Sequence, residues 1–314
     1  MYLTSALAAT TNKSYNSGVR AYKKFCKQVQ VPPFPLAELI LEYFVTSLSR
    51  RVRAATIKCY LSGVQFCSIM AGYPHKISDM GRLYYLVRGI KRLEGRSPRP
   101  SRRPLRVRHL LKLSDFIGAH YHKFDRIMYR AVIALAFFAM LRCSEYTAPG
   151  RWVWDSDTTL TRADVAFRRS GALSLYIKSS KTDPFKVGAC ISLVSTNCHL
   201  CPVSALLKYC QKRGNAPGPL FIHRDGSFLT KYDVVRLLAL CFPSTRGISS
   251  HSFRIGGATA AAKAGVPGHL IQRLGRWRSD AFKKYVKLSP HLLGRWSGFY
   301  GRLFQRQLDY MNGR

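Results

Sequence analysis

A stretch of basic residues interrupted by prolines most constrains how this chain can fold. Residues 88–112 contain ten lysines or arginines, one glutamate and prolines at positions 98, 100 and 104. Charged side chains resist burial and prolines interrupt helices and strands, so the stretch is unsuited to a core. The sequence therefore predicts two main domains, over residues 1–95 and 113–290, joined by a linker over residues 96–112.

The first domain shows the period of amphipathic helices. Tyr15, Val19, Tyr22 and Phe25 recur at helical spacing. Three further segments show the same period, and the four segments lie near residues 15–25, 36–49, 57–64 and 83–90. Four amphipathic helices with short connections predict a small helical bundle.

The second domain mixes two periods. Helices are expected over residues 114–119, 124–141, 144–148 and 202–212. Between Leu160 and Val194 the period changes to two, with Leu173, Leu175 and Ile177 alternating with smaller or polar residues. This pattern predicts a three-stranded antiparallel sheet with the turn over residues 178–188 at a hairpin tip. The predicted fold class is mainly α with a small antiparallel sheet (α+β).

The charge of the chain indicates a polyanionic partner. Lysines and arginines number 51 against 15 acidic residues, which gives a formal net charge of +36. Nucleic acid is the expected partner of such a chain, and its hydrophobic content of 47% is typical of a folded protein rather than a basic tail. The linker is suited to lying along DNA, and is also compatible with a nuclear import signal or a segment that is simply soluble.

The cysteines indicate reduced thiols and no metal. Nine irregularly spaced cysteines suggest an intracellular protein rather than a disulfide framework. Cys198 and Cys201, beside His199, resemble half of a zinc site, but no second pair stands at suitable spacing, although Cys190 and Cys210 are near. We therefore expect no metal.

No membrane role is expected. The longest apolar run, over residues 131–141, is too short to cross a bilayer and is typical of a buried helix. The first residues also lack the pattern of a signal peptide.

One motif is suited to binding an anion. Ser249 and Ser250 are good helix N-caps, so His251 and Arg254 are expected in the first turn of a helix, on one face and beside unbonded backbone N–H groups. Gly265 is expected to end this helix and Pro267 to open the next. A helix-turn-helix whose histidine and arginine touch phosphates fits the same residues.

Two upstream residues add to this motif. Arg142 follows a nearly uniform apolar helix and needs an anionic partner, either Glu145 or a substrate phosphate. Lys181 lies on the expected hairpin tip, where a flexible ammonium can reach a substrate. Tyr285 follows on a later helix.

In this order, the residues resemble the motifs of the tyrosine recombinase (phage integrase-like) family. The segments Ser-Lys-Thr-Asp-Pro-Phe and Leu-Gly-Arg-Trp-Arg-Ser-Asp-Ala-Phe-Lys-Lys-Tyr are most similar to recombinases of eukaryotic mobile elements, of the Crypton and DIRS/Ngaro types. The resemblance covers nearly the whole chain. It implies a helical core-binding domain, a catalytic domain, and a site-specific recombinase that integrates or excises a mobile element.

The resemblance also implies a role for each motif residue. Arg142 and Arg254 would hold the scissile phosphate, and His251 would position it or shuttle a proton. Lys181 would protonate the departing 5′ oxygen. Tyr285 would attack and form a 3′-phosphotyrosyl intermediate, for which no cofactor is needed.

One position departs from the family pattern. Glu145 matches an acidic residue that supports the first arginine. Many relatives have histidine nine residues before the nucleophile, where Arg276 stands here, and Trp277 resembles a tryptophan used by some members. Spacing favours Arg276, side-chain precedent favours Trp277, and Trp277 is our preferred candidate. Tyr300 and Tyr310 are further possible nucleophiles beyond the expected spacing.

The implied partners are double-stranded DNA and further copies of the chain. The amphipathic tail over residues 291–314 either packs on its own domain or docks into a neighbouring subunit of a tetramer. A eukaryotic protein of this kind would be nuclear. Two alternatives are a non-catalytic DNA-binding protein derived from a recombinase and an enzyme similar to type IB topoisomerases. The expected DNA-contacting residues are Lys13, Arg20, Arg50, Arg51, Arg53, Lys58, Arg102 and Arg103.

Overall fold

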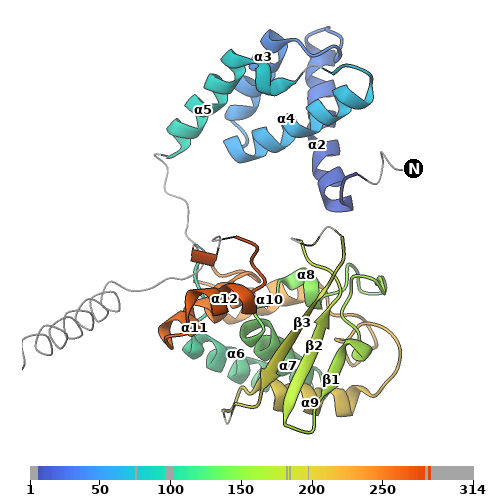
Figure 1. The fold of residues 1–314 in the computed structure, drawn as a ribbon, viewed down its shortest axis with the longest axis vertical. Helices are drawn as coiled ribbons and strands as arrows, with labels where there is room; N and C mark the ends of the chain where they lie inside the picture. Colours follow the sequence, from blue (N-terminus) through green and yellow to red (C-terminus); the bar gives the residue numbers. More distant parts are fainter. Residues whose placement is uncertain are drawn as a thin grey trace, which may run out of the picture. The chain divides into compact units, whose positions relative to one another are not determined.

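The computed structural model of the chain describes residues 6–74, 76–95, 102–181, 183, 185–196, 198–279 and 282–283. The chain divides into two compact units, Met1–Arg99 and Pro100–Arg314 (Figure 1). The described residues are mainly helical with one small antiparallel sheet, as the sequence predicts.

In the described part of the first unit, four α-helices form a bundle. They are α2 (Ala9–Gln28), α3 (Glu38–Ser49), α4 (Ala54–Met70) and α5 (Gly81–Gly95), with a short 3₁₀ turn, η1 (Ile77–Asp79), before α5. The apolar faces meet in a core that includes Tyr22, Phe44, Ile57, Val64 and Leu83. The four predicted helices are therefore confirmed.

Two glycines allow α2 and α4 to pack closely. A Cβ atom at Gly18 would lie 2.6 Å from the Tyr60 Cα, and one at Gly63 would lie 2.8 Å from the Tyr15 Cα. Both distances are shorter than real Cβ atoms tolerate, so each glycine faces the backbone of the opposite helix.

The sheet of the second unit has the strand order β1–β2–β3, with both pairs antiparallel. Its strands are β1 (Val165–Phe167), β2 (Ala172–Ile177) and β3 (Ala189–Val194). Leu173, Leu175 and Ile177 of β2 are buried, and Leu175 pairs with Val165 on one side and Ile191 on the other. The predicted alternation and the hairpin turn between β2 and β3 are confirmed.

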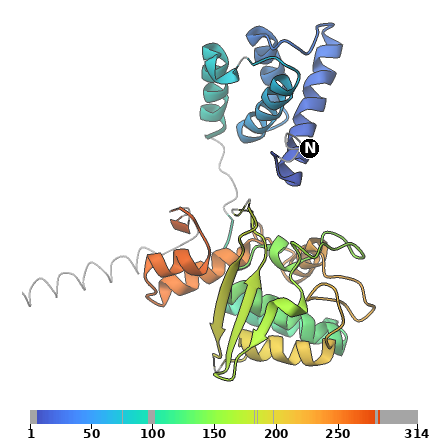
Figure 2. The ribbon, with the colours of Figure 1, turned by 45° about the vertical axis from the view of Figure 1, so that its right-hand side comes forward.

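Helices make up most of the rest of the described second unit. They are α6 (Val107–His120), α7 (Lys123–Phe138), α8 (Cys143–Tyr146), α9 (Pro202–Arg213), α10 (Lys231–Cys241), α11 (Ser252–Lys263) and α12 (Gly268–Leu274), together with the 3₁₀ turn η2 (Arg162–Asp164). The apolar helix α7 is central, because it contacts α6, α8, α9 and α11. Figure 2 shows the strands side by side with α7 and α9 behind them.

The expected linker over residues 96–112 is wrong in its second half. The Arg103 N–H donates to the Gly247 carbonyl at 2.9 Å, and the Leu105 N–H donates to the Ser252 carbonyl at 3.0 Å. Leu105 and Leu110 are buried in the core of the second unit, and α6 begins at Val107 rather than at residue 114. The arginines that suggested a linker lie on the exposed side of this segment.

Candidate active site

The end of α7 brings the first candidate arginine into place. The expected helix over residues 124–141 stops at Phe138, and Met140 adopts a left-handed conformation with φ of 48°. This conformation is uncommon for a residue with a side chain and reverses the chain after the helix. Arg142 then becomes the N-cap of α8.

Glu145 binds the backbone and the side chain of Arg142. The Arg142 N–H donates to Glu145 Oε2 at 2.9 Å, and Arg142 Nη1 donates to Oε1 at 2.8 Å. Glu145 is 2% exposed. The carboxylate therefore stabilises the start of α8 and fixes the orientation of the guanidinium group.

The same carboxylate holds a second arginine. Arg276 Nη2 lies 2.8 Å from Glu145 Oε2, and Arg276 Nη1 donates to the Ala139 and Leu274 carbonyls at 3.2 Å. Arg276 has a φ of 56°, so its backbone also lies in the left-handed region. Burial lowers the pKa of Arg276, and the Glu145 carboxylate acts in the opposite direction. Glu145 thus connects Arg142 to the chain after α12.

Arg254 is almost fully buried, with 1% of its surface exposed. Its guanidinium group donates to the Met140 and Gly275 carbonyls, and its Cζ lies 4.1 Å from the centroid of the Trp277 ring. Cation–π attraction adds to these hydrogen bonds. Arg254 therefore ties the end of α7 to the turn after α12.

The turn after α12 requires a glycine. A Cβ atom at Gly275 would lie 1.7 Å from Trp277 Cζ3, which is far inside the contact distance. Trp277 is 8% exposed and also packs against Phe282, with ring centroids 6.3 Å apart. Trp277 therefore packs beside Arg254, whereas Arg276 points to Glu145.

His251 lies within the electrostatic reach of three arginines. Burial lowers the pKa of His251 to about 4, and the positive charges of Arg102, Arg254 and Arg142 contribute in that order. The imidazole is therefore neutral at neutral pH in the absence of an anion. His251 is itself the N-cap of α11, so the helix begins one or two residues later than Ser249 and Ser250 suggested.

The β2–β3 connection lies next to the Arg276–Trp277 turn. A cavity of about 340 Å³ is lined on one side by Ser180 and Asp183 and on the other by Arg276 and Trp277. Lys181 is exposed on this connection, between the two lining residues. The structure therefore brings the backbone that carries Lys181 close to this turn.

An ion pair joins the β2–β3 connection to the segment after α12. Arg278 Nη2 lies 3.8 Å from Asp183 Oδ1, while Asp183 Oδ2 accepts a hydrogen bond from the Gly188 N–H at 2.8 Å. Asp183 therefore closes the loop of the hairpin and contacts the segment after α12.

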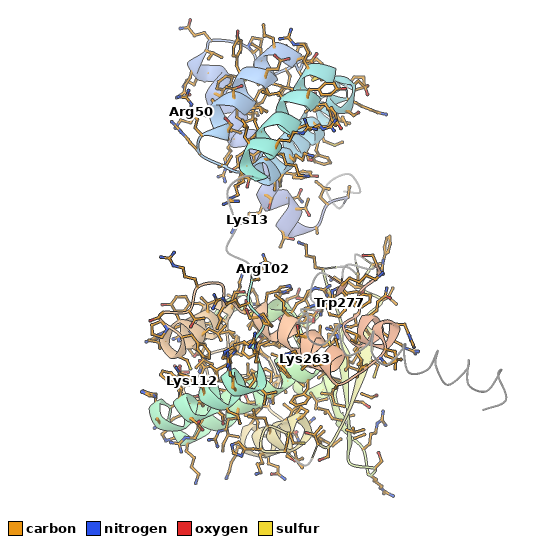
Figure 3. All side chains as sticks on the ribbon, turned by 90° about the vertical axis from the view of Figure 1, so that its left-hand side faces the viewer. Lys13, Arg50, Arg102, Lys112, Lys263 and Trp277 are labelled. Atoms are coloured by element: carbon orange, nitrogen blue, oxygen red, sulfur yellow. The ribbon has the colours of Figure 1, made fainter. Side chains whose placement is uncertain are left out.

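The remaining candidates divide into two groups. Tyr285, Tyr300, Tyr310 and the tail over residues 291–314 lie outside the described residues. The side chains expected to contact DNA are all exposed. Figure 3 shows Lys13 on the first helix of its unit and Arg102 at the start of the second unit.

Sequence reasoning missed the backbone contribution to this site. The Met140 and Gly275 carbonyls accept the hydrogen bonds of Arg254, and both belong to turns with left-handed residues. Gly275, two residues before Trp277, is a weak signal for such a turn. The left-handed conformation of Met140 has no signal in the sequence, because methionine is not a turn residue.

Within the described residues, no group of three or more histidine, cysteine or acidic side chains is arranged to hold a metal ion. None of the described helices combines the length and apolar character that crossing a membrane requires.

Comparisons with known proteins identify the fold. No protein-family model matches the chain, and no curated protein matches it in sequence. The structure of the XerH site-specific recombinase bound to palindromic difH substrate, a post-cleavage complex, is similar with a TM-score of 0.63 and 18% identity. That match covers 92% of this chain and 79% of XerH.

Two integrases are similar over a comparable length. A λ integrase dimer bound to a COC′ core site gives a TM-score of 0.59 and 15% identity, covering 90% of this chain and 73% of that one. The Tn1549 transposon integrase in complex with circular intermediate DNA gives a TM-score of 0.53 and 14% identity, covering 91% and 98%. The chain therefore has the fold of the tyrosine recombinases and integrases.

Proposed function

We propose that this protein is a tyrosine recombinase that cleaves and rejoins DNA strands through a 3′-phosphotyrosyl intermediate. The observation that carries the proposal is the convergence of Arg142, His251 and Arg254 on one place in a recombinase fold. A half-buried histidine within the electrostatic reach of Arg102, Arg254 and Arg142 is suited to an anion, and DNA supplies a phosphate. The net charge of +36 is consistent with this substrate.

In the proposed reaction, the Tyr285 hydroxyl gives its proton to the neutral imidazole of His251 as its oxygen attacks the scissile phosphorus. A bond forms between that oxygen and phosphorus, the bond from phosphorus to the 5′ oxygen breaks, and Lys181 gives a proton to the departing oxygen. Arg142 and Arg254 stabilise the negative charge of the transition state. Attack by a 5′ hydroxyl of another strand reverses these steps and rejoins DNA. The phosphotyrosyl link retains the bond energy, so no external energy source is needed.

Arg276 and Trp277 act as positioning residues in this proposal. Arg276 holds Glu145, which in turn orients Arg142, with both contacts at 2.8 Å. Before DNA binds, Trp277 holds Arg254 through the ring face. Arg276, which departs from the family pattern, then supports Arg142 through Glu145.

Binding of DNA requires the turn over residues 275–277 to shift, because Gly275 and Trp277 cover Arg254. We expect this shift to change the fluorescence of Trp277 when duplex DNA binds. The Trp277→Phe variant should lose that change, whereas Trp152→Phe, on an exposed loop, should retain it. An identical response in both variants would contradict the shift.

We further propose that the substrate is DNA of a mobile element and that the protein acts as a tetramer in the nucleus of a eukaryotic host. The similarity of the sequence motifs to Crypton and DIRS/Ngaro recombinases supports the first part. The amphipathic residues 291–314 support assembly through a tail exchanged between subunits.

A suicide-substrate assay tests the proposal. A DNA half-site with a nick just 3′ of the cleaved bond releases on cleavage the short fragment that carries the 5′ hydroxyl, so the covalent adduct accumulates. Wild type should give an adduct that survives denaturing electrophoresis, and Tyr285→Phe should give none. Tyr300→Phe and Tyr310→Phe are matched controls that should react normally.

Two results would contradict the mechanism: an adduct with Tyr285→Phe, or no adduct with wild type on the terminal sequences of its own element. DNA binding without any adduct would favour the non-catalytic alternative. Relaxation of supercoiled DNA of any sequence would favour an activity similar to type IB topoisomerases.

A further inference from the structure

Two cysteines lie in a turn remote from the candidate active site. Cys198 and Cys201 belong to the connection between β3 and α9, at the opposite end of β3 from the hairpin tip that carries Lys181. The Cys201 N–H donates to the Cys198 carbonyl at 3.0 Å, which closes a β-turn. The end residues of such a turn have Cα atoms within about 7 Å of each other. Disulfides require a Cα separation of about 4.4–6.8 Å, so the turn suits one.

Both sulfur atoms contact the same residue. Thr196 Oγ1 lies 3.1 Å from Cys198 Sγ, and the Thr196 N–H donates to Cys201 Sγ at 3.3 Å. These two threonine atoms are separated by only three covalent bonds. The two cysteine side chains are therefore directed to the same side of the turn.

The two thiols differ in their surroundings. Cys198 is exposed, whereas Cys201 is 4% exposed and is the N-cap of α9, a helix of 12 residues. Burial acts to raise the pKa of Cys201, but hydrogen bonds from Ser195, Ser204 and Thr196 outweigh it and lower the pKa to about 6. Cys201 is therefore mainly a thiolate at neutral pH, and Cys198 is the thiol that an outside molecule reaches.

We propose that Cys198 and Cys201 form a reversible disulfide by exchange with low-molecular-weight disulfides such as glutathione disulfide. Cys198 gives its proton to solvent, its sulfur attacks one sulfur of the small disulfide to form a mixed disulfide, and one small thiolate is released. Cys201 then attacks the Cys198 sulfur and releases the second small thiolate. The two cysteines are oxidised, one small disulfide is reduced to two thiols, and a reducing thiol pool reverses both steps.

The site is independent of the proposed recombination chemistry. The mixed disulfide forms at an exposed residue, and the second step takes place within a turn already closed by a hydrogen bond. Neither step involves the residues around Glu145.

Alkylation mapping of the folded, full-length protein tests the proposal. The protein is equilibrated at pH 7 with mixtures of reduced and oxidised glutathione, quenched with acid, treated with N-ethylmaleimide and digested with trypsin. The tryptic peptide over residues 187–208 contains Cys190, Cys198 and Cys201, and Cys190 is an exposed internal control. Under reducing conditions, all three should be alkylated.

Under oxidising conditions, wild type should lose alkylation at Cys198 and Cys201 together with the mass of two hydrogens, whereas Cys190, which lies outside the turn, should be alkylated or carry glutathione. Cys201→Ser should instead accumulate glutathione on Cys198, and Cys190→Ser should form the disulfide normally. Retained alkylation of Cys198 and Cys201 at excess oxidised glutathione would overturn the proposal. Glutathione on Cys198 of wild type without closure to the disulfide would overturn it as well.

Discussion

Replacing Arg276 with methionine removes one of the two ion pairs of Glu145 and keeps the other. The variant keeps an unbranched side chain of similar length, and its backbone retains the left-handed φ of 56°. It removes the 2.8 Å contact to Glu145 but leaves Arg142 as a partner of the carboxylate. The comparison with wild type therefore measures the second ion pair together with the Arg276 hydrogen bonds to the Ala139 and Leu274 carbonyls.

The magnitude follows from the burial of the pair. Glu145 and Arg276 have side chains that are 1% and 11% exposed. Breaking a buried pair by removing one partner costs about 3–5 kcal/mol, and we expect the lower end because Arg142 still neutralises the carboxylate. At about 2–4 °C per kcal/mol for a domain of this size, the melting temperature of the second unit should fall by roughly 6–12 °C.

Differential scanning calorimetry measures this change, and Arg278→Met is the matched control. Arg278 is a neighbouring arginine that is 65% exposed and 3.8 Å from its acidic partner, so its loss should cost less than about 1 kcal/mol. Equal melting temperatures for the two variants would refute the assignment of Arg276 to a buried pair.

A kinetic measurement separates positioning from stability. At a temperature well below unfolding and at saturating DNA, Arg276→Met should form the covalent adduct more slowly, while its affinity for DNA remains close to that of wild type. A normal rate at full occupancy would show that Glu145 alone orients Arg142.

Three further outcomes are expected. The pKa of His251 should be about 4 by NMR without DNA and should rise when phosphate binds. As the pH is lowered from 6.5 to about 4, the free energy of unfolding should fall, because the unfolded chain takes up a proton that the folded chain does not. The His251→Gln variant should lose this dependence. Gly63→Ala should lower the urea midpoint of the first unit by the equivalent of about 1–3 kcal/mol, whereas Gly89→Ala, with open space around it, should not; equal midpoints would contradict the close helix packing. Affinity for nonspecific DNA should fall steeply with salt, and a flat response would contradict phosphate binding.

The sheet and the bundle could be predicted because their signals are local. Leu173, Leu175 and Ile177 alternate with more exposed residues, and this period of two decides which face of the strand is buried. The helices of the first unit have apolar residues at helical spacing for the same reason.

The start of α6 could not be predicted from composition. Leu105, Leu110 and Leu113 are buried, but the arginines between them gave the segment the character of a linker. Composition averages over both faces of a helix, whereas burial depends on one face only.

The roles of Arg276 and Trp277 could not be separated from spacing either. The two residues are adjacent, and the left-handed φ of Arg276 decides that one side chain points to Glu145 and the other to Arg254. The sequence brings Arg142 and Arg254 together only through the family resemblance, since 112 residues separate them and their link is the Met140 backbone.

Mapping the covalent adduct tests the central claim most directly. After reaction with a nicked half-site, nuclease and trypsin digestion should leave nucleotide on the short peptide over residues 285–287, joined through a 3′ phosphate to Tyr285, and the released strand should carry a 5′ hydroxyl. Nucleotide on Tyr300 or Tyr310 instead, or a link through a 5′ phosphate, would contradict the account.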